Sequence, residues 1–576
     1  MPRILAHYQQ GKNMIIGLDV GGTHTDIVLV GEKGLERKIK VPTDTSALFQ
    51  TVLTGIEKIT ENIPSEKIKH AVLSTTLTTN AIVRNKLSPA AMIVSAGPGI
   101  DPEAFRTNEH YFTVSGTIDH SGKEIKPIDK NQIEEIARRI KSEEIRHVGV
   151  VGKFSTRNPE HEIEIEKIIA PYFDKIFLGH RISGHLNFPR RVATTFLNAS
   201  VYPIHKAFFE AVKSSLKQKG ISIPIYILKA DGGTMAFDAS IDFPGQSVLS
   251  GPSASVMGSV AFAPENNETI VMDIGGTTTD MAVLINQVPL LSPLGIEIGK
   301  YKTLIRALNS YSIGLGGDSV VRMEGNSLKI GPDRVGPAMA YGGPVATPTD
   351  ALFVLGKADD ASGDKNKSIQ GLTPIAEKLG LTVEKAAFEI FDLACQDILT
   401  AAREMIGRIN SKPVYTIKEV LSGYQLKPRH IMVLGGPASY FAEHMAQISE
   451  FTIRTVPQWS VANAIGTALS RTTCEVTLFA DTQKGIAMAP EESFSKPINS
   501  DFTKEDALAL GHELLRQKAL QTGANIDDLD LDILENLEFN MVRGFRLTGK
   551  NIRIKLQVKP GLIHNYKMIT DKIAAM

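Results

Sequence analysis

The sequence predicts an α/β protein with two lobes and a small α+β region at the C-terminal end of the chain. Three observations lead to this prediction. An eight-residue motif occurs twice, short apolar runs flank each copy, and a third apolar run ends in a pair of glycines. Because repetition at this scale indicates related structural units, each lobe should carry one copy of the motif.

The repeated motif reads DVGGTHTD at residues 19–26 and DIGGTTTD at residues 273–280, with six of the eight positions identical. The first copy lies between apolar runs at 15–18 and 27–30, and the second between runs at 269–272 and 281–284. Apolar runs on both sides of a glycine turn predict the two strands of a β-hairpin. The third run, at 431–434, predicts a strand that ends at Gly435-Gly436-Pro437, with a helix after it from about Ser439.

The glycines and threonines of both hairpins indicate a phosphate site. Adjacent glycines reach backbone angles that other residues avoid, and they let main-chain N–H groups approach phosphate oxygens. Threonine hydroxyls add short donors, and a carboxylate at a strand end can hold Mg²⁺, usually through water. Two such hairpins on opposite lobes would grip the phosphates of a nucleotide from both sides. The alternative is that each glycine pair is only a tight turn, and the duplication favours the clamp.

The composition limits the classes of partner and compartment. A length of 576 residues suggests roughly four structural units. The net charge is zero, with 63 basic and 63 acidic residues, so nucleic acid is not an expected partner. No apolar run approaches the ~18 residues of a membrane span, and residues 1–13 read as a loose extension without the apolar core of a secretory signal. Two cysteines, Cys395 and Cys474, cannot form a disulfide framework, which fits a reducing cytoplasm.

Further segments give the chain a resemblance to one family. From about residue 14 to about residue 471 it resembles the hydantoinase A/5-oxoprolinase family, a branch of the actin-like ATPase superfamily that also includes sugar kinases and Hsp70. Both hairpins match the two phosphate motifs of that superfamily, and residues 433–437 look like its adenosine motif. The segments similar to this family in particular are STTLTTNA at 74–81, RVATTFLNA at 191–199, DGG at 231–233, SGP at 250–252, GLGGDS at 314–319 and PTDA at 348–351.

The resemblance implies an architecture and an activity. It implies ATPase-like lobes at 14–183 and 184–471, hinged around an ATP cleft, and an α+β region at 472–576. It also implies ATP and Mg²⁺ as cofactors and the opening of a cyclic amide, such as 5-oxoproline or a hydantoin, after phosphorylation of the amide oxygen. A hydantoinase B-like subunit and a second copy of this chain are the partners that it leaves open.

Two other functions use the same cleft. One is an ATP-driven activator or conformational switch that acts on a partner protein, and the other is a small-molecule kinase. The fold supports all three, because fold alone does not determine function.

The repeat and the resemblance together name the expected site residues. The carboxylates that begin and end each hairpin turn are expected to be catalytic, and Mg²⁺ is expected at the first of each pair: Asp19 and Asp26, Asp273 and Asp280. For Asp26 and Asp280, bracing of the turn is an equal alternative. Contacts with the nucleotide are expected from Gly21, Gly22, Thr23, Thr25, Thr75, Thr76, Asn80, Gly275, Gly276, Thr277, Thr278, Gly316, Gly317, Gly435, Gly436 and Pro437.

The resemblance also implies contacts with the substrate from Arg191, Asp231 and Gly232. An arginine suits a carboxylate because its guanidinium donates two parallel hydrogen bonds. For Arg191, a structural role at the start of a helix is an equal alternative. His24 and Asp318 depart from the family pattern, which has an aromatic residue and a third glycine at these positions. Since both lie on the expected substrate side, they bear on the substrate more than on ATP.

Overall fold

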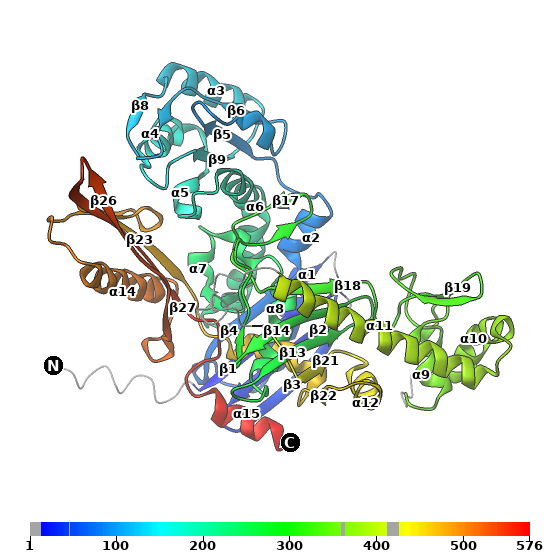
Figure 1. Ribbon diagram of the computed structural model, residues 1–576. Helices are drawn as coiled ribbons and strands as arrows, with labels where there is room; N and C mark the ends of the chain where they lie inside the picture. The colour runs from blue at the N-terminus through cyan, green and yellow to red at the C-terminus, as the bar shows by residue number, and fades with distance from the viewer. Residues whose placement is uncertain (1–12, 23, 45–46, 359–362, 412–424) are drawn as a thin grey trace.

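The computed structural model describes residues 13–576 except 23, 45–46, 359–362 and 412–424. Two six-stranded sheets lie near the centre of the molecule, and each carries one of the predicted hairpins (Figure 1). The predicted α/β fold with two lobes and a C-terminal α+β region is confirmed. Thr23 and nearly all of the predicted N-terminal extension fall outside the described residues. In the described part of the chain, no helix has the length and apolar character needed to cross a membrane.

The first central sheet contains the first hairpin. Its strand order is β12-β11-β4-β1-β2-β3, and β1, β4 and β11 run parallel. Helices α1 (Leu48–Thr60) and α6 (Phe188–Gln218) bury their apolar faces against it. The strands are β1 (Met14–Val20), β2 (His24–Gly31), β3 (Gly34–Pro42), β4 (Ile68–Thr75), β11 (Ile225–Leu228) and β12 (Thr234–Ala236).

The second central sheet contains the second hairpin. Its order is β15-β14-β13-β21-β22, and β18 pairs with β14. Helices α11 (Val383–Ser411) and α12 (Ala438–Ile448) share its apolar core. The strands are β13 (Glu268–Ile274), β14 (Thr279–Ile285), β15 (Val288–Pro289), β18 (Ser310–Ile313), β21 (His430–Leu434) and β22 (Thr452–Thr455). The predicted strand at 431–434 and the helix after it are therefore confirmed.

Two short helices join the sheets. Helices α8 (Ser250–Val260) and α13 (Ala462–Leu469) belong to an apolar cluster that takes residues from both sheets. Glycines allow the close packing: a Cβ on Gly17 of β1 would lie 2.1 Å from the carbonyl oxygen of Ala464, and one on Gly466 would lie 2.1 Å from the main-chain nitrogen of Gly258. Backbones are therefore in contact where the two sheets meet.

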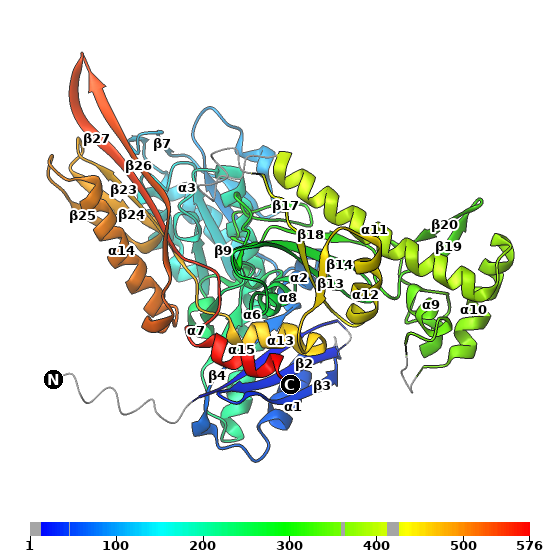
Figure 2. The same cartoon turned by 60° about the horizontal axis from the view of Figure 1, so that its bottom comes forward.

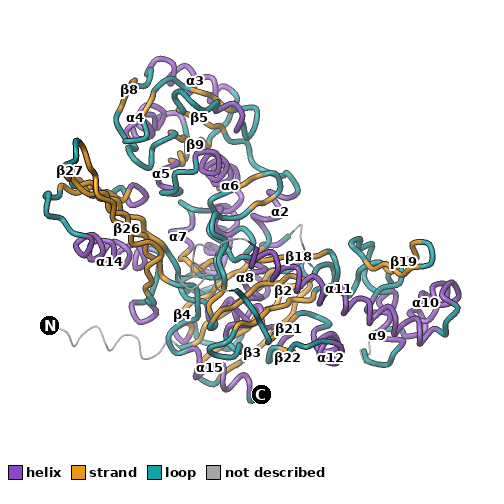
Figure 3. Tube along the Cα trace, viewed as in Figure 1, coloured by secondary structure: helices purple, strands orange, loops and turns teal. Residues whose placement is uncertain are grey.

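Two further units, an upper unit and a C-terminal unit, lie outside the two central sheets. The upper unit in Figure 1 has the sheet β10-β9-β5-β6 with helices α3 (Lys130–Ser142) and α4 (Glu160–Ile169). Its strands are β5 (Ala91–Ser95), β6 (Tyr111–Thr113), β9 (His147–Gly152) and β10 (Lys175–Leu178). Figure 3 shows the helices of the upper unit on the outside of its short strands, so this unit is a small α/β layer separate from the two central sheets.

The C-terminal unit is a five-stranded antiparallel sheet, β25-β24-β23-β27-β26, covered by helix α14 (Lys504–Gln521). Strands β26 and β27 form a long hairpin that projects from the molecule (Figure 2). Helix α15 (Tyr566–Ala574) then returns to pack beside β3. The strands are β23 (Glu475–Asp481), β24 (Ile486–Ala489), β25 (Phe494–Pro497), β26 (Leu531–Arg543) and β27 (Arg546–Val558).

The predicted domain limits stay predictions. After the predicted limit at residue 183, the chain returns to the first central sheet. Strands β11 and β12 follow residue 183, and they complete the sheet that contains the first hairpin. The second lobe also carries an outlying unit at the right of Figure 1. That unit consists of β19 (Val321–Glu324), β20 (Ser327–Ile330), α9 (Pro348–Val354) and α10 (Lys365–Leu379).

Candidate functional site

The two hairpin turns have the same main-chain geometry. Gly21 donates its N–H to the carbonyl of His24 at 3.1 Å, and Gly275 donates to the carbonyl of Thr278 at 2.9 Å. In each hairpin the two aspartates lie opposite each other on paired strands, Asp19 with Asp26 and Asp273 with Asp280. The sequence repeat therefore corresponds to a structural repeat.

The tip of the first hairpin is open. Gly22 is exposed, and a Cβ added there would meet no atom within 4 Å. Behind the tip, the hydroxyls of Thr25 and Thr43 lie 2.8 Å apart, and Lys40 Nζ lies 3.1 Å from Asp26 Oδ1. Burial raises the pKa of Asp26 and Lys40 opposes that shift. This ion pair favours the bracing role for Asp26.

The tip of the second hairpin rests on the glycine-rich loop 314–319. The carbonyl of Gly275 accepts the N–H of Gly317 at 2.9 Å, and that of Gly276 accepts the N–H of Asp318 at 2.7 Å. A Cβ on Gly316 would lie 2.5 Å from the carbonyl oxygen of Gly275, so only glycine fits at this position. The structure thus places Gly316 and Gly317 directly against the second turn, as predicted for residues of one site.

In the part of the chain that the structure describes, Asp280 of the second turn has no lysine paired with it, whereas Asp26 of the first turn has Lys40. Thr277 is exposed at the tip, and the hydroxyl of Thr278 donates to Asp280 Oδ2 at 3.4 Å. Burial raises the pKa of Asp280, and hydrogen bonds from Ser312 and Thr278 act against it. Asp280 is stabilised by hydroxyl groups, so bracing and catalysis both remain open for it.

One of the two predicted reasons for the glycine pairs, the unusual backbone angles, is wrong. None of Gly21, Gly22, Gly275 and Gly276 has a positive φ. Close approach explains two of them instead: a Cβ on Gly21 would lie 2.8 Å from the carbonyl oxygen of His24, and one on Gly276 would lie 2.7 Å from Asp318 Oδ2. The packing of the chain itself does not require Gly22 to be glycine, which suits a position that a ligand approaches.

One amide side chain links the two hairpins. Asn463, near the start of α13, donates from Nδ2 to Asp19 Oδ2 at 3.2 Å and to Asp273 Oδ2 at 3.4 Å. The hydroxyl of Ser255 on α8 also makes a short hydrogen bond to Asp273 Oδ2. Carboxylates from opposite lobes therefore meet at a single amide group.

Both of these carboxylates resist ionisation. Burial raises the pKa of Asp19 to about 7, and repulsion from Asp26 and Asp273 adds to this shift. Hydrogen bonds from Ser74 and Asn463 oppose it. Burial also raises the pKa of Asp273, and Asp280 adds repulsion. Like charges that lie close together in a partly dehydrated site favour the binding of a cation.

The predicted Mg²⁺ site fits this pair. In the described part of the chain, no three potential metal ligands come together, so a cage made of protein groups alone is not available there. Mg²⁺ usually keeps several waters and binds one or two carboxylates together with the phosphates of a substrate. Asp19 and Asp273 are the two carboxylates that would hold Mg²⁺, and the ion would supply positive charge to neutralise the phosphates.

The predicted adenosine motif reaches the same place. Gly435 follows β21 with a φ of +103°, and a Cβ there would lie 2.2 Å from the carbonyl oxygen of Ile274 and 2.6 Å from Asp273 Oδ1. Gly436 has open space around it, and Pro437 precedes α12. A Cβ on Gly317 would lie 3.5 Å from the ring of Pro437, so this motif and the glycine-rich loop are neighbours.

The segment from residue 74 to residue 80 joins the site through α8. Ser250 Oγ accepts the N–H of Thr75 and donates to the carbonyl of Thr75, both at 3.0 Å. Thr75 Oγ1 also accepts the N–H of Leu77 at 3.2 Å, and Asn80 donates to Thr76 Oγ1 at 3.2 Å. The structure thus places the three predicted residues beside α8 at the start of helix α2 (Leu77–Val83), where Thr75 accepts the first N–H and the N-cap residue Thr76 makes no side-chain capping hydrogen bond.

The contacts of Arg191 favour its structural alternative. The residue is fully buried, and its terminal nitrogens donate to the carbonyls of His185, Gly152 and Lys153 at 2.6–2.8 Å. Burial lowers its pKa to about 10, although Glu162 opposes the shift. A guanidinium that is already bound to three carbonyls has few donors left for a substrate.

Asp231 lines a polar cavity that follows β11, at a different place from the hairpin tips, and Gly232 comes next in the chain. Asp231 is 1% exposed, and Gly232 has a φ of +81° with Met257 Sδ 2.7 Å from the position of a Cβ. The predicted residues thus lie at two places, the hairpin tips and the cavity at Asp231, and Arg191 lies at neither.

Sequence reasoning missed Asn463 and Ser255. Asn463 lies in the segment VANAIGTAL, and Ser255 in SGPSASV. Each is a polar residue in a short helix of small side chains, which is common in packed helices and has no distinct spacing. The only available signal was a polar side chain within an otherwise apolar segment.

Two sequence models of one family match this chain. The model described as the Hydantoinase/oxoprolinase N-terminal region matches residues 15–173, and the model described as Hydantoinase/oxoprolinase matches residues 191–476. These matches include both hairpins, Gly435 and Asn463. The chain belongs to the hydantoinase/oxoprolinase family. The resemblance drawn from the sequence is thereby confirmed.

Relatives in this family include enzymes that act on different substrates. The caprolactamase subunit alpha of Pseudomonas jessenii is 23% identical over 68% of this chain and 62% of its own length. The 5-oxoprolinase 1 of Arabidopsis thaliana is 21% identical over 73% of this chain and 38% of its own length. The acetone carboxylase beta subunit of Xanthobacter autotrophicus is 22% identical over 68% of this chain and 62% of its own length. The chain therefore spans less than two thirds of these relatives.

Solved structures share the fold of this hydantoinase/oxoprolinase chain. The ATP-dependent caprolactamase from Pseudomonas jessenii superposes with a TM-score of 0.71 at 18% identity, over 96% of this chain and 87% of that one. The nucleotide-free acetone carboxylase gives a TM-score of 0.68 at 18% identity, over 97% and 89%.

Proposed function

We propose that this protein uses ATP to open a cyclic amide. The observation that carries the proposal is the convergence of both hairpins on Asn463, which brings Asp19 and Asp273 from opposite lobes to one place. The open tip at Gly22 and the exposed Thr277 leave donors available to phosphates. The names of the caprolactamase and 5-oxoprolinase relatives support a ring amide as the substrate class.

The chemistry needs ATP because an amide carbonyl is a poor electrophile. In the proposed reaction the amide oxygen attacks the γ-phosphorus and ADP leaves. One water then adds to the activated carbon and the ring C–N bond breaks, which gives an acyl phosphate. A second water attacks the carbonyl carbon of the acyl phosphate and the C–O bond breaks, so phosphate leaves with the former amide oxygen and the ring-opened amino acid is released. The lobes contribute positioning and charge neutralisation, which dominate the catalysis of phosphoryl transfer.

A screen of ATP hydrolysis tests this proposal. The purified protein would be assayed with Mg²⁺ against 5-oxoproline, hydantoin, ε-caprolactam and matched acyclic amides, with and without a hydantoinase B-like subunit. We expect a cyclic amide to stimulate hydrolysis and to be consumed in equal amounts. Hydrolysis that is stimulated only by a protein would establish the switch, and a stable phosphorylated product would establish the kinase.

We further propose a hydantoinase B-like subunit as a partner. Relatives are named as subunits of caprolactamase and acetone carboxylase. The projecting β26–β27 hairpin exposes apolar side chains that a partner could cover: Phe539, Val542, Phe545 and Leu547 are between 59% and 104% exposed. Co-expression followed by size-exclusion chromatography tests this. Phe545→Lys should release the partner, and co-elution that is unchanged by this substitution would remove the hairpin from the interface.

A further inference from the structure

A second polar site lies on the same sheet edge as the phosphate hairpin. Strands β11, β4 and β1 run parallel and adjacent, and Ile227, Leu73 and Leu18 are in register across them. Lys229 and Asp231, which follow β11, therefore emerge beside Asp19 at the carboxyl ends of the strands. Two strand spacings separate them, roughly 10 Å. In open α/β sheets, ligands bind at this edge.

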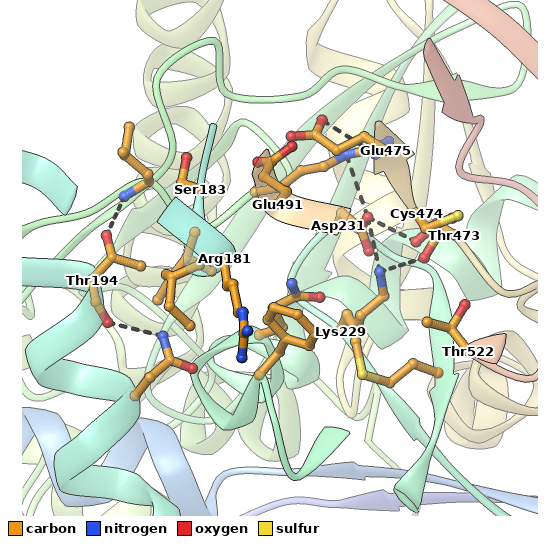
Figure 4. A pocket seen from close by; sticks show the side chains of 18 of the residues that line it. Arg181, Ser183, Thr194, Lys229, Asp231, Thr473, Cys474, Glu475, Glu491 and Thr522 are labelled. Atoms are coloured by element: carbon orange, nitrogen blue, oxygen red, sulfur yellow. Dashed lines mark hydrogen bonds and ion pairs between the residues drawn. The ribbon is translucent and has the colours of Figure 1, made fainter. Parts of the chain in front are cut away.

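A cavity occupies this position, and we name it the Asp231 chamber. Its wall combines Lys229 and Asp231 of the first lobe with Arg306 of the second lobe and with Thr473, Glu475 and Glu491 of the C-terminal unit. Figure 4 shows Lys229 and Asp231 facing Thr473, with Glu475 and Glu491 on the adjoining side. A second cavity shares Arg306, Glu475 and Glu491 with it, and each has a volume of about 70 Å³. Each is about half the size of the ~150 Å³ cavity that holds a benzene ring.

Most polar groups of the chamber satisfy one another. Asp231 accepts hydrogen bonds from the N–H of Gly233 at 3.0 Å and the hydroxyl of Thr473 at 2.8 Å, and Lys229 donates to the carbonyl of Thr473 at 2.8 Å. Burial alone would raise the pKa of Asp231, but Lys229 and Arg306 hold it below its usual value. This cluster is a fixed, ionised wall.

Two side chains in the wall keep unused hydrogen-bonding atoms. In the described part of the chain, Nε and Nη1 of Arg306 are buried without a hydrogen-bond partner, and so is Oε2 of Glu491. Arg306 is held in place from Nη2, which donates to Gln557 at 2.5 Å. These two nitrogens form ion pairs with the carboxylates of Asp231 and Glu475, at 3.4 and 3.7 Å, and lack a hydrogen bond to either. Glu491 is held by its other oxygen, which accepts the N–H of Gly184.

Unused buried donors and acceptors are costly, so they indicate a missing polar partner. Burial raises the pKa of Glu491, although Lys518 opposes the shift, as expected for a carboxylate with one unpaired oxygen. A partner must be small and must offer an acceptor to Arg306 and a donor to Glu491. A ring amide does so, because its cis geometry presents the carbonyl oxygen and the N–H on the same side.

We infer that the Asp231 chamber binds the ring amide, with its carbonyl oxygen accepting from Arg306 and its N–H donating to Glu491. The inference rests on the proposed function and adds the location of the substrate and two residues that recognise it. It also gives the C-terminal unit a role, since that unit supplies Glu491 and closes the chamber. An open-chain secondary amide in its trans form presents the two groups on opposite sides and fits less well.

Ligand-observed NMR titration with two probes tests this inference. 2-Pyrrolidone has both groups, and N-methyl-2-pyrrolidone keeps the carbonyl but lacks the N–H. We expect the wild-type protein to bind 2-pyrrolidone about tenfold more tightly, because the N-methyl compound leaves Glu491 unpaired. Glu491→Gln should abolish this preference, whereas Arg306→Lys should weaken both probes equally and leave the preference intact. Equal binding of both probes to the wild type, or no binding of either, would overturn the inference.

Controls separate the chamber from the proposed function. Glu324→Gln alters an exposed glutamate that pairs with Arg322 and Lys329, and it should behave as the wild type. Thermal unfolding and the affinity for an ATP analogue should be unchanged in every variant, which excludes misfolding. Selective binding without lactam-stimulated ATP hydrolysis would support the chamber and defeat the proposed function. Stimulated hydrolysis that ignores both substitutions would support the function and defeat the chamber.

Discussion

The two hairpins share their sequence and their turn geometry, yet their surroundings differ. The first tip is open around Gly22, and its outer carboxylate, Asp26, is paired with Lys40. The second tip rests on the loop that contains Gly316 and Gly317, and its outer carboxylate, Asp280, is bound by hydroxyl groups. A repeated motif thus fixes the backbone of each turn, while the neighbouring elements decide what each copy can do. Asp19 and Asp273 are the part of the repeat that remains equivalent, because Asn463 contacts both.

The largest expected effect tests this equivalence. Asp19→Asn and Asp273→Asn keep the shape of the side chain and remove its charge, so each should lower the rate of ATP hydrolysis by roughly 100-fold or more. Nucleotide affinity should fall less, and the Mg²⁺ concentration needed for half-maximal activity should rise. Steady-state kinetics at varied Mg²⁺ measures all three. Asp501→Asn, on an exposed loop, is the control. Normal hydrolysis by both variants would reduce these carboxylates to turn braces.

The next effect separates the two tips. Gly22→Val and Gly276→Val should each weaken binding of a non-hydrolysable ATP analogue by roughly 100-fold, which calorimetry measures. Only Gly276→Val should also lower the unfolding temperature, because its side chain would displace Asp318 and disturb the Asp318–Arg334 ion pair. Gly407→Val, which meets nothing within 4 Å on α11, controls for the added side chain. Unchanged affinity in either tip variant would contradict the clamp.

A smaller effect tests the link between the lobes. Asn463→Ala removes both hydrogen bonds and leaves Asp19 and Asp273 unbridged, so ATP turnover should fall by about tenfold. Asn463→Asp should be worse than Asn463→Ala, because it adds a negative charge beside two buried carboxylates. Kinetics and urea unfolding of the two variants measure these effects. If Asn463→Asp is the milder of the two, the repulsion inferred here is absent.

The last effect is a dependence of stability on pH. The pKa of Asp19 is about 7 in the folded protein against an ordinary value of 3.8, so the folded state binds the extra proton between these values. The free energy of unfolding should therefore fall as pH rises from about 4 to about 7, by a few kcal/mol at most. Urea unfolding in EDTA at several pH values measures it. Asp19→Asn should flatten the curve, and a stability that rises over this range in wild type but not in the variant would reverse the assignment.

Much of the fold and part of the site could be predicted from the sequence. The repeat located both hairpins, and a third apolar run located the strand before Gly435, because short apolar runs next to glycine turns form a local pattern. The reason for the glycines could not be predicted, since contacts such as Gly276 with Asp318 and Gly316 with Gly275 come from distant segments.

Tertiary packing also decided the residues that were missed or placed elsewhere. Asn463 lies in a later helix, and nothing local shows that it reaches Asp19. Arg191 was a candidate for substrate binding because its residue type suits carboxylates, but its three carbonyl partners depend on how the upper unit folds onto α6. The Asp231 chamber combines three parts of the chain, so the resemblance could indicate Asp231 but not Arg306 or Glu491.

The transfer of oxygen from the amide to phosphate tests the central claim most directly. The protein would be incubated with ATP, Mg²⁺ and a cyclic amide labelled with ¹⁸O in its carbonyl, with the hydantoinase B-like subunit present and absent. If the amide oxygen is phosphorylated before water attacks, the released phosphate should carry one ¹⁸O atom for each ring opened. Ring opening that releases unlabelled phosphate would contradict the phosphorylated-amide route.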